Sequence, residues 1–415
     1  MKRRPGEWAL KKSTSSKKKY DTKRVATTFV ISLGIMSIFA DLTYEGSRSI
    51  LGPWLGLLGL SATAISIITG SGELIGYSFR IFSGRWADRS HNYWPITIFG
   101  YVIQMIAVPL MALAGNWAIA TWLVIQERFG KAIRNPPRDA MLSHAGKEIG
   151  YGWAFGLHEA LDQTGAVLGP LAIAGVLLLE HANQIPLPRD YRVVFAILLV
   201  PAVITIVLLM FNWKTYPHPE ELDSTPMDLN ARGLPNSFWI YLGGSMLVGV
   251  GMGGFPLIAY HLQISHIVPP VWIPIFYAIS MGIAGLGSLF LGRVLDRTGM
   301  KILIPLTLAS AVAIPLIWFG GFALSIVGIA LWGLGTGVQE SLIPAIVSKM
   351  VPRVRRASAF GILTAGYGIS LFLGGVIIGL LYIMGIREIV MFGTLAEIIA
   401  IPVFVLVSSK IKIRT

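Results

Sequence analysis

Apolar segments of about 20 residues recur along the whole chain, and this is the length at which an α-helix crosses a lipid bilayer. Of the 415 residues, 54% are hydrophobic and only 13% are charged. The sequence therefore predicts an all-α polytopic membrane protein with twelve transmembrane helices. The expected spans are residues 25–45, 60–83, 93–114, 117–138, 150–179, 191–212, 237–261, 270–291, 301–320, 322–347, 357–383 and 387–409.

A long polar stretch divides these spans into two groups of six. We expect a basic tail at 1–24, an N-terminal six-helix bundle at 25–212, a cytoplasmic linker at 213–236, a C-terminal bundle at 237–409 and a second tail at 410–415. The first apolar run is too long for the core of a cleavable signal peptide, so we expect it to remain as the first span.

Positive charge is concentrated at the N-terminus and on one side of the expected spans. Residues 1–24 hold ten Lys or Arg against two acidic residues, and so contribute +8 of the net charge of +13. Such a cluster is typical of a cytoplasmic flank and can contact anionic lipid headgroups, so it does not indicate nucleic-acid binding. Counting Lys and Arg loop by loop places both termini in the cytoplasm, with the protein in the plasma (inner) membrane.

One short motif occurs twice, each time after a long apolar run. Gly84-Arg85-Trp86-Ala87-Asp88-Arg89 returns 208 residues later as Gly292-Arg293-Val294-Leu295-Asp296-Arg297. Gly130 and Gly335 are 205 residues apart, as are Gly169 and Gly374. Repeats at a fixed offset predict two halves built from the same membrane unit.

These paired motifs resemble the G-x-x-x-D-R-x-G-R-K signature of the major facilitator superfamily, and the resemblance covers nearly the whole chain. The second copy, continued by Gly299 and Lys301, matches more fully than the first, which departs after Arg89. The resemblance implies two pseudo-symmetric six-helix bundles around a central cavity, working by alternating access.

The resemblance also implies that the motif residues form a conformational latch. An aspartate would lie at the positive N-terminus of a helix from the other half. By pseudo-symmetry we expect Asp88 to face Arg355 or Arg356, and Asp296 to face Arg134 or Arg138. The alternative is that each Asp/Arg pair merely ends a helix. The expected latch residues are Gly84, Asp88, Arg89, Gly292, Asp296, Arg297, Arg134, Arg355 and Arg356.

Gly156, Gly165, Gly169 and Pro170 resemble the antiporter motif of the same superfamily. The match ends there, because Ile173 and Ala174 stand where the family has further glycines. The motif favours export, while the alternative is a Gly-rich helix that only packs closely.

Ionisable residues lie inside the expected spans, mostly in the first half. Each costs about 2.5–3.5 kcal/mol at membrane depth, so each requires a partner or a water-filled cavity. The i,i+4 spacing of Asp41 with Glu45, and of His158 with Asp162, gives each helix one polar stripe. The resemblance implies that these stripes converge on the cavity. The candidate proton-coupling and substrate residues are Asp41, Glu45, Glu73, Glu127, Arg128, His158, Glu159 and Asp162.

Depth separates these candidates. We expect Asp41 and Glu45 in the outer portion of the first span, and Glu73 and Asp162 midway along theirs, where an acid is better placed to carry protons. The alternative for each residue is neutralisation of a basic group, with Glu73 or Glu127 pairing with Arg128, and Asp162 with His158.

We expect a secondary active transporter that exports a small amphipathic or cationic compound in exchange for protons. One alternative is a proton-coupled importer of a small organic anion, with Arg128 or Arg134 binding the anion and Asp41 or Glu45 taking the proton. Another is a non-transporting receptor or enzyme. The sequence has no nucleotide-binding loop, metal cluster or nucleophile constellation, so we expect no cofactor, no metal and no enzymatic activity. The expected partners are the substrate, protons and the bilayer, for a monomer.

Overall fold

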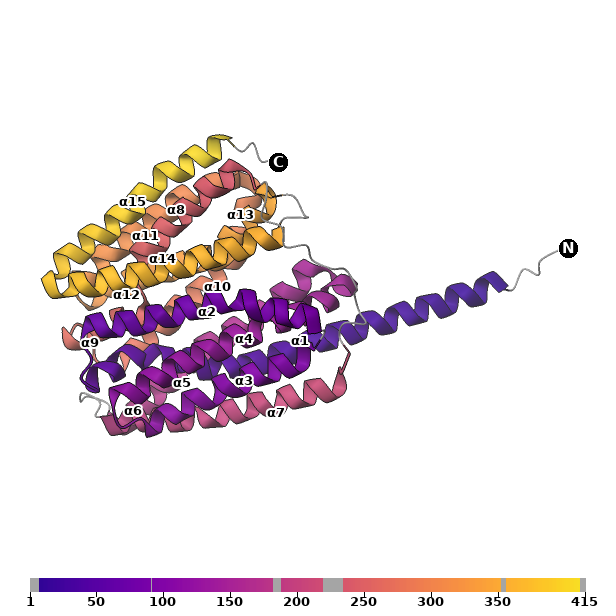
Figure 1. Cartoon of the computed structure of the whole chain (residues 1–415), viewed down its shortest axis with the longest axis horizontal. Coiled ribbons are helices and arrows are strands. Elements are labelled where there is room, and N and C mark those ends of the chain that lie inside the picture. Colours follow the sequence, from indigo (N-terminus) through magenta and orange to yellow (C-terminus); the bar gives the residue numbers. More distant parts are fainter. Residues whose placement is uncertain (1–6, 91, 182–187, 219–233, 352–355, 411–415) are drawn as a thin grey trace.

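The computed structural model describes residues 7–90, 92–181, 188–218, 234–351 and 356–410, and these residues form helices joined by short connections, with no strand. The bundle that begins with α1 also contains α2–α7, and the second bundle contains α8–α15 (Figure 1). The helices are α1 (Glu7–Leu57), α2 (Ala62–Ser90), α3 (Tyr93–Leu110), α4 (Trp117–Ile149), α5 (Tyr151–His181), α6 (Pro188–Ile197), α7 (Leu199–Thr215), α8 (Asn236–Met252), α9 (Phe255–Ile264), α10 (Trp272–Thr298), α11 (Leu303–Trp318), α12 (Phe322–Gly337), α13 (Ile343–Met350), α14 (Arg356–Met384) and α15 (Ile386–Lys410).

Three pairs of these helices each form one span, and short turns extend others. The paired helices are α6 with α7, α8 with α9, and α12 with α13, the last joined by the π-helical turn η4 (Val338–Leu342). The 3-10 turns η1 (Met111–Leu113) and η3 (Gly299–Ile302) extend α3 and α11. The expected twelve spans are therefore confirmed in the described residues.

Ten of the spans are long and apolar enough to cross a membrane by composition alone. The other two are α2 and α4, which carry ionisable residues where apolar ones would be expected. In α4 these are Glu127, Arg128, Lys131 and Arg134. Charge at this depth places α2 and α4 beside polar partners or water, because lipid cannot solvate it.

The first span is longer than expected, because α1 continues to Leu57 rather than ending near residue 45. The expected depth of Asp41 and Glu45 was therefore wrong: both lie near the middle of the span Thr22–Leu57. The physical reason is Arg48, which marks a boundary by composition but is paired inside the bundle with Glu73, at 2.9 Å.

The two halves meet closely at what we call the distal end, the end that holds residues 58–61 and Gly385, opposite the start of α1 and the end of α15 (Figure 1). A Cβ on Gly52 would lie 1.7 Å from the Pro256 carbonyl oxygen. The Thr63 hydroxyl donates to the Gly379 carbonyl at 2.6 Å. Backbones that approach this closely seal the distal end.

Small residues also bring α1 and α5 together within the first half. A Cβ on Gly165 would lie 2.3 Å from the Ile38 carbonyl oxygen, and one on Gly169 would lie 2.5 Å from that of Leu42. Gly156 has no neighbour within 4 Å of such a Cβ. Close packing, the alternative for this motif, therefore accounts for Gly165 and Gly169, and the link to export stays a prediction.

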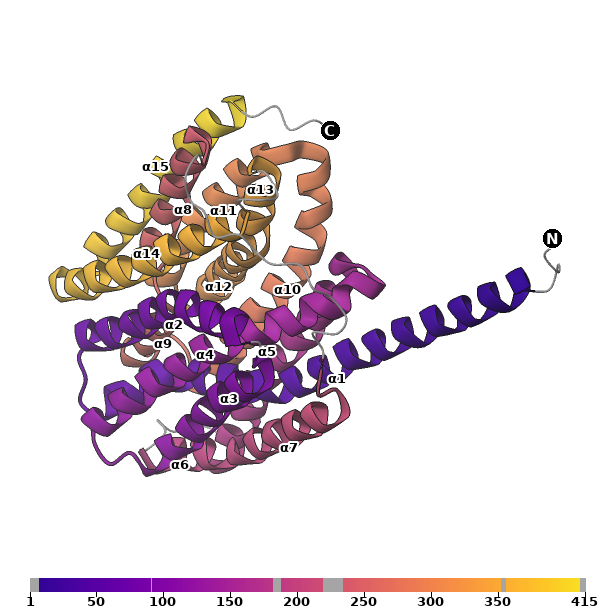
Figure 2. The ribbon, with the colours of Figure 1, turned by 45° about the vertical axis from the view of Figure 1, so that its right-hand side comes forward.

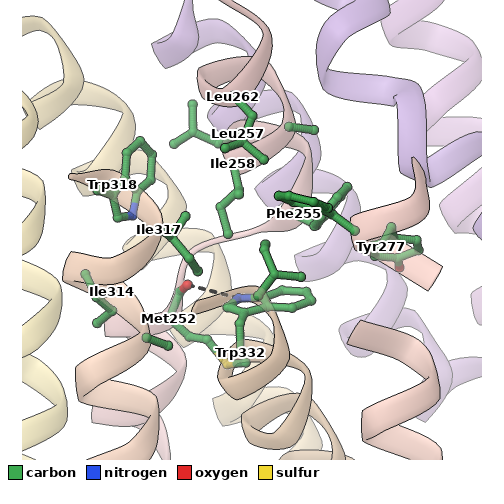
Figure 3. Close-up of a cluster of buried hydrophobic side chains, with 14 of the residues drawn as sticks. Met252, Phe255, Leu257, Ile258, Leu262, Tyr277, Ile314, Ile317, Trp318 and Trp332 are labelled. Carbon is green, nitrogen blue, oxygen red and sulfur yellow. Dashed lines mark hydrogen bonds between the residues drawn. The ribbon is translucent and has the colours of Figure 1, made fainter. Parts of the chain in front are cut away.

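The span formed by α8 and α9 is broken at two glycines. Gly253 has a φ of 65°, in the left-handed region that glycine adopts most readily. Trp332 of α12 donates its indole N–H to the Met252 carbonyl at 3.3 Å, next to the aromatic side chains of Phe255 and Tyr277 (Figure 3). The break therefore has a fixed geometry.

Candidate functional site

A cavity of about 660 Å³ lies between the two halves. Its first-half wall comes from α1, α2, α4 and α5, and its second-half wall from the α8–α9 break, α10, α12–α13 and α14. The lining extends from Ser66 and Ile378, next to the sealed distal end, to Leu142 and Phe360 near the opposite end. The cavity therefore begins just inside the sealed distal end and extends away from it.

The structure brings seven of the eight candidate residues to this cavity. They are Asp41, Glu45, Glu73, Arg128, His158, Glu159 and Asp162. The eighth, Glu127, is outside the lining and is 4% exposed. The i,i+4 spacing therefore located the polar faces of α1 and α5, whereas of the two neighbouring charges of α4 only Arg128 reaches the lining.

Glu73 lies between two arginines. Its Oε1 is 2.9 Å from Arg48 Nη2 and 3.3 Å from Arg128 Nη2. Tyr44 accepts hydrogen bonds from both guanidinium groups. Neutralisation, the alternative stated for Glu73, is therefore the arrangement found.

A second set of charges is buried behind the lining. Glu127 Oε2 is 3.4 Å from Arg128 Nε, and its Oε1 accepts a hydrogen bond from Gln104 at 2.7 Å. Arg134, 1% exposed, donates to Gln104 and Tyr101, and its Nη2 is 3.8 Å from Asp41 Oδ1. These contacts explain how α4 retains charges inside the bundle: α3 supplies the neutral partners Gln104 and Tyr101, and α1 supplies Asp41.

Four lining carboxylates have no ion pair within 4.0 Å among the described residues: Glu45, Glu159, Asp162 and Glu340. The expected pair of Asp162 with His158 is not formed at that distance, and His158 Nε2 instead lies 3.1 Å from the Ser37 hydroxyl. Asp162 Oδ1 is buried without a hydrogen-bond partner in the described residues. Glu159 and Glu340 are exposed in the cavity.

The second-half wall is mostly neutral and includes several aromatic side chains. Tyr277, Trp332 and Tyr367 line it, and Glu340 is its one charged member in the described residues. Glu340 lies in the π-helical turn, which brings the consecutive residues Gln339, Glu340 and Ser341 to the lining. π-turns are rare and often mark functional sites.

The expected latch falls largely outside the described residues. Arg355 lies in the undescribed segment 352–355, and the surroundings of Gly292 and the side chains of Asp88, Asp296 and Arg356 are not described. Arg138 pairs with its neighbour Asp139 at 2.9 Å, and Gly84 lies against Pro136. Arg89 and Arg297 are exposed. The latch therefore stays a prediction.

Two residues that contact the predicted acids in the cavity were not predicted from the sequence. Arg48 lay beyond the expected end of the first span, although its spacing from Glu45 placed it on the same helix face. Tyr277 carries no charge and gave no signal, yet its hydroxyl donates to Glu45 Oε2 at 2.6 Å.

The Major Facilitator Superfamily model matches residues 27–338. The chain is 35% identical over 382 residues to uncharacterized protein Rv2265 of Mycobacterium tuberculosis, covering 91% of this chain and 92% of that protein. It is 24% identical over 400 residues to the uncharacterized MFS-type transporter MJ1317 of Methanocaldococcus jannaschii, covering 92% and 96%.

Among solved structures, the nucleoside transporter NupG superposes with a TM-score of 0.70 at 15% identity, covering 92% of this chain and 99% of that chain. At this identity the similarity shows the fold alone. Together with the family match over most of the chain, the two bundles and the central cavity lead to one conclusion: the chain belongs to the major facilitator superfamily of membrane transporters.

Proposed function

We propose that this transporter exports a small amphipathic cation in exchange for protons. The observation that carries the proposal is the charge of the cavity wall. Seven carboxylates line it, against five lysines and arginines. The acids are Asp41, Glu45, Glu73, Asp139, Glu159, Asp162 and Glu340, and the bases are Arg48, Arg80, Arg128, Lys131 and Arg138.

Pairing strengthens this argument, because the basic groups are the more fully engaged. Arg48 and Arg128 share Glu73, and Arg138 is paired with Asp139. The exposed Glu159 and Glu340, from opposite halves, interact electrostatically across the cavity. A cationic group between them would relieve the repulsion of two like charges.

The neutral second-half wall, with its aromatic and aliphatic side chains, fits the rest of such a compound. The faces of Tyr367 and Trp332 offer apolar area and can attract a cation by their ring quadrupoles. A cavity of about 660 Å³ is in the size range of sites for small molecules. Amphipathic cations therefore suit both walls at once.

Exchange would follow from competition for the same acids. Burial favours the neutral form of a carboxylic acid, so an unpaired cavity acid is stabilised by either a proton or a bound cation. Asp162 fits this role better than Glu73, which two arginines hold ionised. The anion-import alternative has weaker support, because Arg134 does not line the cavity and Arg128, which does, is already paired with Glu73 and Glu127.

Efflux of ethidium from cells that lack their own efflux pumps tests the proposal. The natural chain should lower dye accumulation, and a protonophore should abolish the effect. Asp162→Asn and Glu340→Gln should lose export, whereas Glu388→Gln, which removes an acid outside the cavity, should retain it. Accumulation equal to the empty vector, with folded protein present, would count against cation export and lead to organic-anion uptake in proteoliposomes.

A further inference from the structure

Among the described residues, one side-chain hydrogen bond joins the two halves inside the cavity. Tyr277 of α10 donates its hydroxyl to Glu45 Oε2 of α1 at 2.6 Å. Glu45 is 8% exposed and Tyr277 is 1% exposed, and both line the cavity. The ring of Tyr277 packs beside Phe255, with ring centroids 4.4 Å apart (Figure 3). The hydroxyl is therefore held in place by the second half while it binds the first.

Glu45 has few other ways to compensate its charge. Arg48, one turn along α1, directs its guanidinium to Glu73 at 2.9 Å and to Tyr44 at 3.2 Å, and forms no ion pair with Glu45 within 4.0 Å among the described residues. Among the described residues, the charged or titratable groups that interact with Glu45 are Asp41, Tyr44 and Arg48 of α1, Tyr277 of α10, and Glu340 of η4. In the described part of the chain, Tyr277 is the side chain that donates a hydrogen bond to the Glu45 carboxylate.

We propose that the Tyr277–Glu45 hydrogen bond is a charge-dependent lock between the halves. It holds the distal end closed while Glu45 is ionised, and it weakens when a proton or the cationic group of the substrate neutralises Glu45. Tyr277 is then a positioning residue that acts through Glu45. This inference rests on the proposed exchange of a cation for protons.

The position of the bond explains why it would act on the distal end. Tyr277 lies in the second turn of α10, which begins at Trp272 next to the distal end. α10 packs along α5 of the first half (Figure 2). Separating the halves at the distal end would therefore pull Tyr277 away from Glu45 and break the bond.

Neutralisation changes the strength of the bond by a measurable amount. A hydrogen bond to an ionised acceptor is roughly twice as strong as one between neutral groups. That difference corresponds to about a tenfold change in the ratio of the two states. A lock that either ligand can release lets the loaded transporter switch but retards the empty, ionised one, as strict exchange requires.

The absence of cysteine from the chain makes the distal end easy to monitor. Leu113→Cys and Met384→Cys, at exposed distal positions of the two halves, provide the only thiols for a pair of spin labels. Distances are measured in lipid nanodiscs from about pH 3.5 to about pH 8, a range that spans the titration of an ordinary glutamic acid, without substrate. In the natural background, acidification should lower the ratio of short to long distances about tenfold.

Three variants test the lock. Tyr277→Phe should flatten the pH profile to less than about twofold and favour long distances at every pH. Glu45→Gln, which keeps Tyr277 in place, should give the same flat profile, and the double variant should match either single one. Tyr241→Phe is the matched control, because Tyr241 is equally buried and its hydroxyl bonds the Ile343 carbonyl within one half, at 3.1 Å.

Retention of the natural pH profile in folded Tyr277→Phe or Glu45→Gln would overturn the lock, as would a natural background that does not respond to pH. The distance measurement needs no substrate, so it is separable from the ethidium assay. A flattened profile in the variants without dye export would refute the proposed function and leave the lock standing. Dye export by the natural chain, with an unchanged pH profile in the variants, would support the proposed function and refute the lock.

Discussion

Replacing Gly52 with alanine should shift the transporter away from the closed distal end. Gly52 of α1 faces Pro256 of α9, and an alanine Cβ there would lie 1.7 Å from the Pro256 carbonyl oxygen and 2.6 Å from its carbonyl carbon. Real Cβ atoms stay at least about 3.0 Å from such atoms, so the two helices must separate by about 1.3 Å. The obstacle is backbone, which cannot move aside like a side chain.

The size of the effect follows from where the contact lies. Overpacking a tight contact costs about 1–3 kcal/mol. Gly52 and Pro256 belong to different halves, so opening the distal end relieves this cost, and the closed state alone is destabilised. A difference of about 1–3 kcal/mol changes the ratio of the two states by about 5- to 150-fold. The gain in helix propensity from glycine to alanine is the same in both states and cancels.

The spin-label pair at Leu113 and Met384 measures this shift directly. Gly52→Ala should move the distance distribution toward long distances at every pH, with little change in thermal unfolding. Gly175→Ala is the matched control, because nothing lies within 4 Å of a Cβ added there. If folded Gly52→Ala gave the same distance distribution as Gly175→Ala, the close contact of α1 with α9 would not be what holds the distal end closed.

Three substitutions should instead act on stability, measured as thermal unfolding in detergent. Gly165→Ala places a Cβ 2.3 Å from the Ile38 carbonyl oxygen within one half, so rocking cannot relieve it, and it should cost about 1–3 kcal/mol without changing the spin-label distances. Glu73→Gln leaves two arginines facing each other and should cost about 3 kcal/mol of stability. This is the low end for breaking a buried ion pair, because the Glu73 side chain is 18% exposed. A variant as stable as the natural chain would argue against the pairing. Gly253→Ala should cost about 1–2 kcal/mol for its φ of 65°, whereas Gly243→Ala, with open space around it, should not.

The architecture was predictable because its signals are periodic and repeated. Apolar runs of membrane length gave the number of spans, and the motifs at Gly84 and Gly292 indicated the two halves. The end of the first span was predicted too early because of a single residue, Arg48. A charge in an apolar run marks the end of a span only when it has no partner inside the bundle. That partner, Glu73, lies 25 residues away and is brought to Arg48 only by the packing of α2 against α1.

Helix spacing gives the face on which an acid lies, but not the group that will face it. Glu73 and Asp162 have equivalent positions in the sequence argument, yet α1 and α4 supply two arginines to the first and none within 4.0 Å to the second in the described residues. This difference matters for proton binding, because two arginines stabilise the ionised form of an acid, whereas an unpaired buried acid is stabilised by binding a proton. Glu45 is a third case, in which an uncharged tyrosine from the other half is the partner. A hydrogen bond between the two halves exists only in conformations that bring the halves together. The partner of a cavity acid in a two-state transporter therefore depends on the conformation. No residue pattern along one helix can encode such a partner.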